Sequence, residues 1–169
     1  MAGAEASELT PGKPTMSTPE APLPHIDEHV VDIASDPEAV WEALLRSVDG
    51  SFSSATTTRA ARLLGCADVE RSGPRPLART STFPGFHVEN ADRPHELAVA
   101  GSHRFSDYAL IFRLEPLSAD RTRLKAETRA VFPGLKGDVY RTLVIGTGAH
   151  VLMTRRLLGA VRRRVERSS

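Results

Sequence analysis

The sequence of 169 residues has one cysteine, few aromatic side chains and almost no net charge. The lone cysteine, Cys66, excludes an intramolecular disulfide and a thiolate metal cluster, and it favours a reducing compartment. Because 22 basic side chains nearly balance 21 acidic ones, the chain as a whole does not favour nucleic acid as a partner. No segment reaches the roughly 18 apolar residues of a membrane span, and residues 1–8 lack the basic start and apolar run of a signal peptide. We therefore expect a cytoplasmic protein.

Common catalytic and cofactor motifs are also missing. The sequence has no GxGxxG, P-loop, GxSxG or CxxC pattern. It has six histidines without HxH or HExxH spacing, namely His25, His29, His87, His95, His103 and His150. Two of these, His25 and His29, would share one face of a strand but lie about 13 Å apart. We therefore predict no metal and no cofactor, and any catalysis would be acid/base chemistry in a pocket.

Large apolar side chains are almost absent from residues 1–24, which are rich in Ala, Pro, Ser, Thr and Glu. Such a segment cannot bury enough apolar surface to offset the entropy lost on ordering, so we predict a disordered tail. The remaining residues, 25–167, are enough for a single domain with a substantial core.

The first part of this domain favours one strand followed by two short helices. Residues 25–34 predict a strand in which Val31 and Ile33 share one face. The Ser-Asp-Pro-Glu sequence that follows supplies an N-cap and a first-turn proline, and it predicts a helix over residues 37–48. A second short helix is predicted over residues 57–64.

The middle of the chain has the alternation that is typical of strands. Extended segments are predicted over residues 77–83, 86–90, 95–105, 108–115 and 122–132. In the last of these, small or apolar side chains on one face are opposite charged side chains on the other, Arg123, Lys125, Glu127 and Arg129. We therefore predict an antiparallel sheet of five or six strands with one face in water.

Residues 135–167 have apolar side chains at helical spacing and predict one amphipathic helix of about 30 residues, or about 45 Å. This segment contains eight basic and two acidic side chains. Cations in its last turns suit the helix dipole, so a solvated helix end is one interpretation. The alternative is a weak contact with an anionic membrane through the cluster Arg162, Arg163 and Arg164, with the pair Arg155 and Arg156 as a second basic cluster.

The order of these elements, with Asp-Pro-Glu-Ala-Val-Trp at residues 36–41, resembles the START-related SRPBCC superfamily over residues 26–166. This superfamily includes the birch-pollen allergen and polyketide cyclase/dehydrase-like proteins. The resemblance implies an α+β helix-grip fold, in which a curved antiparallel sheet wraps around a long C-terminal helix and two short helices follow the first strand. A pocket for an apolar small molecule would lie between sheet and helix. The superfamily includes carriers, sensors and enzymes, so the resemblance does not imply one activity.

Small side chains occur on both surfaces that would face each other in this fold. They favour either close packing of helix and sheet or space for a ligand, and the sequence leaves both open. The candidate ligand-binding residues are Gly101, His103, Tyr108, Leu110, Phe112, Ala126, Thr128, Ala130, Leu143, Gly146, Thr147 and His150.

Three side chains are candidates for acid/base chemistry: His150, His103 and Tyr140. Each has a structural alternative, for example a core histidine that is hydrogen-bonded to a sheet carbonyl. The first functional hypothesis is therefore binding of an apolar lipid, polyketide or steroid-like molecule. The second is a cyclase or dehydratase that uses these residues. The third is a docking module that uses the basic end of the last helix.

Overall fold

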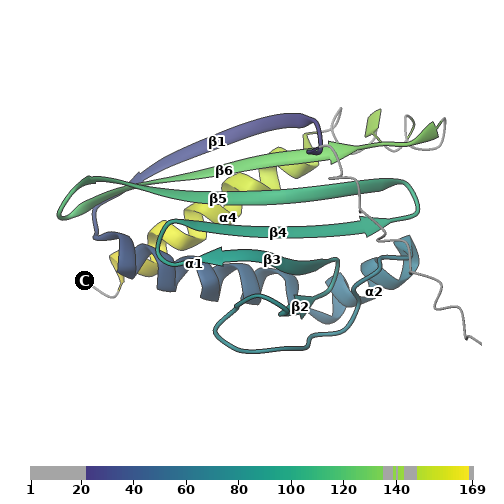
Figure 1. Ribbon diagram of the computed structural model, residues 1–169, viewed down its shortest axis with the longest axis horizontal. Coiled ribbons are helices and arrows are strands. Elements are labelled where there is room, and N and C mark those ends of the chain that lie inside the picture. The colour runs from purple at the N-terminus through teal and green to yellow at the C-terminus, as the bar shows by residue number, and fades with distance from the viewer. Residues whose placement is uncertain (1–21, 135–138, 140, 143–147, 168–169) are drawn as a thin grey trace, which may run out of the picture.

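The computed structural model describes residues 22–134, 139, 141–142 and 148–167. Residues 1–21 of the predicted tail lie outside the described residues. The described chain forms one antiparallel sheet of six strands, in the order β1-β6-β5-β4-β3-β2, with helices on one face (Figure 1). The strands are β1 (His25–Ile33), β2 (Thr82–Phe83), β3 (Phe86–Asp92), β4 (Glu96–His103), β5 (Ser106–Ser118) and β6 (Arg121–Val131).

The two helices after β1 begin and end close to the predicted positions. Helix α1 (Pro37–Phe52) begins where the Asp36 carboxylate accepts a hydrogen bond from the backbone N–H of Ala39 at 3.0 Å. This bond satisfies one of the open N–H groups of the first turn, as an N-cap residue should. Helix α2 (Ala55–Leu64) has a capping box between Ser54 and Thr57. The extended segment predicted at residues 77–83 is reduced to the two residues of β2.

The C-terminal helix, α4 (Ala149–Glu166), is shorter than predicted. It has 18 residues, about 27 Å at 1.5 Å per residue, and its N-cap Gly148 has a left-handed φ of 68°. This conformation is incompatible with a helix that continues unbroken through residue 148, so the prediction of one continuous helix over residues 135–167 is wrong at that residue. None of the helices in the described residues is both long and apolar enough to span a membrane.

Helices α1 and α4 cover the same face of the sheet and enclose the core (Figure 1). One apolar cluster joins Val40 and Leu44 of α1, Val161 of α4, and Phe112 and Leu124 of the sheet, each with no solvent exposure. The helical spacing and the strand alternation in the sequence place these side chains on facing surfaces. Burial of such side chains stabilises the fold by about 1.5–3 kcal/mol each.

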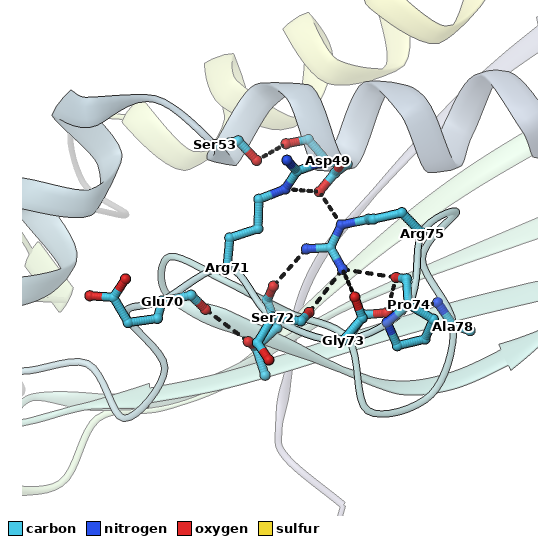
Figure 2. Close-up of polar contacts among 11 residues, drawn as sticks. Asp49, Ser53, Glu70, Arg71, Ser72, Gly73, Pro74, Arg75 and Ala78 are labelled. Atoms are coloured by element: carbon cyan, nitrogen blue, oxygen red, sulfur yellow. Dashed lines mark hydrogen bonds and ion pairs between the residues drawn. The ribbon is translucent and has the colours of Figure 1, made fainter.

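The long connection between α2 and β2 is tied to α1 by a group of arginine contacts (Figure 2). The Asp49 carboxylate, near the end of α1, accepts hydrogen bonds from Arg71 and from Arg75 Nε, the latter at 3.0 Å. Arg75 also donates to the carbonyls of Ser72 and Thr82 at 2.9 and 2.8 Å. One guanidinium thereby satisfies backbone groups on both sides of the connection and fixes the chain that leads into β2 and β3.

The opposite face of the sheet carries the predicted charged side chains, with one correction. The Glu127 side chain is only 9% exposed, so it is not solvated as the alternation predicted. Arg113, Arg129 and His25 cover it and donate to its carboxylate at 2.6, 2.7 and 3.3 Å. The hydrogen bond from Arg113, helped by those from Arg129 and His25, outweighs burial and lowers the pKa of Glu127 to about 2.

Candidate functional site

A cavity of about 310 Å³ lies between the helices and the sheet. It is at the end of the sheet where α2 and the first turns of α4 lie, on the right in Figure 1. Its apolar walls come from α1, α2, α4, four strands and the residue that follows β6, and include Ile26, Phe52, Ala60, Ala61, Leu64, Phe86, Leu110, Ala130, Phe132 and Met153. The few polar side chains in the lining are Thr57, Cys66, His103, Ser106, Tyr108, Thr128, His150 and Thr154.

The opening of the cavity can be located from lining residues that are also exposed to solvent. Ala60 of α2 is exposed, and Met153 of α4 is 47% exposed. These two residues come from the two helices on either side of the cavity. The opening therefore lies between α2 and the second turn of α4.

Six of the predicted ligand-binding residues line this cavity: His103, Tyr108, Leu110, Thr128, Ala130 and His150. Two others do not, because Phe112 and Ala126 have no solvent exposure and belong to the solid part of the core. Phe112 and Ala126 are on the same face of their strands as the lining residues, but they lie farther along the sheet. The alternation in the sequence predicts which face of a strand a residue is on, and it does not predict where along the strand the cavity lies.

Gly101 does not line the cavity either, and its lack of a side chain has another reason. A Cβ at this position would lie 2.0 Å from the Gly85 carbonyl oxygen and 2.8 Å from the Tyr108 ring. Gly101 therefore permits close approach of the turn between β2 and β3. Four predicted residues, Tyr140, Leu143, Gly146 and Thr147, lie outside the described residues.

Next to the cavity, a carboxylate lies between two imidazoles, of which only that of His150 lines the cavity. Asp27 Oδ2, on β1, is 2.9 Å from His150 Nε2 and 3.2 Å from His29 Nε2. The three side chains are largely buried, with 13% exposure for His150, 15% for His29 and 21% for Asp27. Because an ionised carboxylate can only accept, both histidines donate through Nε2. The site thus joins the edge strand β1 to the first turn of α4.

Several neighbours keep Asp27 ionised in this partly buried position. Burial alone would raise the pKa of Asp27, but the nearby Thr128 hydroxyl and the imidazoles of His150 and His29 outweigh it, so the pKa lies below its usual range. Neither Asp27 Oδ1 nor Thr128 Oγ1 has a hydrogen bond of normal geometry among the described residues. Asp27 therefore serves as a fixed anion that orients His150.

His103 has a different environment on the same cavity. Its Nδ1 accepts a hydrogen bond from the backbone N–H of Phe105 at 3.1 Å, so its proton lies on Nε2 in the neutral form. Burial lowers the pKa of His103 and favours this neutral form, despite the opposing effect of Asp107. His150 thus donates through Nε2 to Asp27, whereas neutral His103 carries a donor at its own Nε2.

Tyr108 and Cys66 form part of the cavity wall and are not suited to acid/base chemistry near neutral pH. The Tyr108 hydroxyl donates to the Gly85 carbonyl at 2.7 Å, and its ring packs edge-on against Phe86 at 5.2 Å. Burial raises the pKa of the Cys66 thiol, so the thiol form dominates near neutral pH. In the described parts of the chain, no group of three or more His, Cys, Asp or Glu side chains is arranged to hold a metal ion.

Comparison with known proteins agrees with this architecture. No family model and no curated protein sequence matches the chain. Among solved structures, the Zhui aromatase/cyclase from Streptomyces sp. R1128 matches with a TM-score of 0.53 at 18% identity, covering 86% of this chain and 94% of that one. A norcoclaurine synthase mutant from Thalictrum flavum matches with a TM-score of 0.53 at 14% identity, covering 86% and 98%. The chain has the helix-grip fold.

This is the fold that the resemblance implied, and it confirms the predicted α+β architecture. A third helix-grip structure, a protein from Arthrobacter aurescens, matches with a TM-score of 0.53 at 12% identity, covering 83% of this chain and 85% of that one. At such identities the matches establish the fold and do not transfer an activity.

Sequence reasoning missed several residues of this helix-grip cavity. The α2 residues were not considered, since a short polar helix gives no signal of a cavity wall. Asp27 and His29 do not line the cavity but are joined to its lining residue His150, and they did have a signal, because they share strand parity with Val31 and Ile33. Two polar side chains on the apolar face of a strand indicate a buried polar site.

Proposed function

We propose that this protein binds an apolar small molecule in the cavity between the helices and the sheet. The supporting observation is a space of about 310 Å³ with mostly apolar walls, next to the first turns of α4. Farther along α4, the same space between helices and sheet is filled by core side chains. Small side chains at Ala60, Ala61 and Ala130 keep this space open. Since protein interiors are normally close-packed, such a space is a typical ligand site.

The size of the cavity narrows the class of ligand. Small-molecule pockets usually measure about 300–1,000 Å³, and this one, at about 310 Å³, is at the lower end. A compact polyketide, a steroid-like ring system or a single acyl chain suits it better than a lipid with two chains. Aromatic side chains in the lining, including Phe52 and Phe86, favour a flat or ring-containing ligand.

Binding of the fluorescent apolar probe N-phenyl-1-naphthylamine tests this proposal. We expect saturable fluorescence enhancement with the full chain, and loss of it in Ala130→Phe, which fills the cavity from β6. The matched control is Val131→Phe, since Val131 is the next residue of β6 and is 36% exposed. Equal probe binding by both variants, with native thermal unfolding, would contradict the proposal.

A second candidate function is a cyclase- or dehydratase-type reaction in the same cavity. It is favoured by the pairing of His150 with Asp27 at 2.9 Å, beside a cavity that His103 also lines. The carboxylate holds the imidazole of His150 in one orientation, which suits removal of a proton next to a carbonyl. Neutral His103 would stabilise the oxygen that leaves or becomes an alcohol by a hydrogen bond from its Nε2–H, and the proton taken up by His150 would end on that oxygen.

This candidate is tested with a β-hydroxyketone substrate, following loss of one water by mass spectrometry. His150→Gln removes the base but keeps a similar volume, so turnover should fall by about 100-fold or more while probe binding persists. Asp27→Asn should reduce turnover less. If His150→Gln turns over the substrate as fast as the unchanged protein, His150 is not the base. Binding and catalysis are thus distinguishable by their separate readouts.

A further inference from the structure

The outer face of α4 carries a continuous stripe of exposed side chains. At 100° per residue these positions fall within about 140° of the helix circumference, opposite the buried Leu158, Val161 and Val165. The exposed members of the stripe are Leu152, Arg155, Arg156, Arg162, Arg163, Glu166 and Arg167. The stripe extends about 22 Å along the helix.

Charge on this stripe is strongly one-sided. Five arginines are accompanied by one acidic residue, Glu166, which accepts a hydrogen bond from Arg162 Nε at 2.7 Å. The acidic side chains of the neighbouring helix α1 have their own cations, since Arg93 pairs with Glu38 and Glu42 at 2.8 and 2.9 Å. A local excess of four positive charges therefore faces water, although the whole chain is close to neutral.

The structure selects among the arginines of the two predicted clusters. Arg162 and Arg163 lie on the stripe, but Arg164 lies on the other side of the helix and is half-buried. Arg155 and Arg156, two turns earlier, lie on the stripe as well. They bring its positive charge toward the end of α4 that borders the cavity.

Apolar side chains are exposed at that same end. Leu152 is 51% exposed and Met153 is 47% exposed, and Met153 lines the cavity opening. Leu63 of α2 is 80% exposed as well. Exposed apolar groups beside a basic helix face are typical of helices that lie in the interface of a bilayer.

We propose that the outer face of α4 docks on an anionic lipid bilayer, with Leu152 and Met153 entering the headgroup region. The arginines attract anionic headgroups, and the apolar residues gain free energy when they are buried in the bilayer interface. A nucleic-acid phosphate backbone offers the same attraction but no apolar region in which to bury them. Docking in this orientation places the cavity opening at the membrane. The docking surface does not depend on occupancy of the cavity, so this proposal goes beyond the proposed function.

The test is co-flotation of the full chain with phosphatidylcholine vesicles that do or do not contain about 30% phosphatidylserine. We expect binding to the anionic vesicles only, and its loss in about 0.5 M salt, where charges are screened over a few ångströms. Arg155→Glu with Arg156→Glu should weaken partitioning by at least about tenfold. The matched control reverses two exposed arginines elsewhere, Arg46→Glu with Arg121→Glu, whose side chains are 59% and 60% exposed.

Equal loss in both double variants would overturn the proposal, because general charge and not this face would then control binding. Stronger binding to duplex DNA than to anionic vesicles would overturn it as well. Entry of the apolar end is tested with Leu152→Trp, whose emission should shift to the blue and be quenched by brominated lipid. An unchanged emission spectrum on bound vesicles would contradict insertion. Circular dichroism checks that these surface variants remain folded.

Discussion

The layer between the helices and the sheet is built differently at its two ends. Around the C-terminal half of α4, Val161 belongs to the same cluster as Leu124 and Phe112, and none of the three is exposed. Around the first turns of α4, His150 and Ala130 border a cavity of about 310 Å³. The same sheet and the same helix thus provide a solid half and a hollow half.

The difference lies in the size and polarity of side chains, since the backbone arrangement is continuous. In the solid half, branched and aromatic residues from both layers interdigitate. In the hollow half, alanine and threonine occupy the inward positions of β6, and α4 contributes a histidine, His150, whose Nε2 donates to Asp27. A fold can therefore provide rigidity and space for a ligand along one interface.

The largest expected effect compares one leucine from each half. Leu124→Ala, in the solid half, should reduce the free energy of unfolding by about 3–4 kcal/mol, because the lost methyl groups leave an enclosed gap. Leu110→Ala, which enlarges an existing cavity, should reduce it by about 1–2 kcal/mol, because Leu110 already lacks neighbours on one side. Urea unfolding measures both. Equal losses would mean that the hollow half is packed as tightly as the solid half.

A medium effect is expected from Glu127, the buried carboxylate on the opposite face of the sheet. Its pKa of about 2 in the folded state is lower than the ordinary 4.5, so it stabilises the protein above pH 4.5, and this contribution disappears as the pH falls toward 2. With allowance for screening by water around the arginines, Glu127→Gln should cost about 1–2 kcal/mol at pH 7. The difference in free energy of unfolding between the unchanged protein and Glu127→Gln should decrease as the pH is lowered from 4.5 toward 2, as urea unfolding at each pH would measure.

The control for this variant is Glu115→Gln, because the Glu115 side chain is 46% exposed and has an ion pair with Lys125 at 2.6 Å. A surface pair of this kind contributes about 0–1 kcal/mol. If both variants lose the same stability at pH 7, the arginine contacts of Glu127 are no stronger than an ordinary surface pair.

The smallest effect is expected at Thr128, which borders the hollow half. Its hydroxyl is buried without a hydrogen bond of normal geometry among the described residues, so Thr128→Val should change the free energy of unfolding by no more than about 0.5 kcal/mol. The same substitution removes a group that lowers the pKa of Asp27. A loss above about 1.5 kcal/mol would show that the hydroxyl is a structural partner of Asp27.

Much of the fold was predictable because its signals are local. The alternation in residues 122–132 identified β6, and the Ser-Asp-Pro-Glu sequence identified the start of α1. The start of α4 was not predictable from the sequence, since the helical spacing of apolar residues continues through residue 148. Only the left-handed φ of Gly148 shows that α4 begins after this residue. The burial of Glu127 was missed because an alternating charge indicates an outward face and says nothing of the arginines that cover it.

The sequence by itself determined the order of elements, the wet and dry faces of the strands and the resemblance to helix-grip proteins, because periodicity and capping act between near neighbours. Only the tertiary structure decided where the layer is hollow. It alone brought Asp27 and His29 of the first strand to His150 of the last helix, 123 residues away from Asp27. Such meetings depend on how far each element extends and how its large side chains fill the space between layers, which no local pattern encodes.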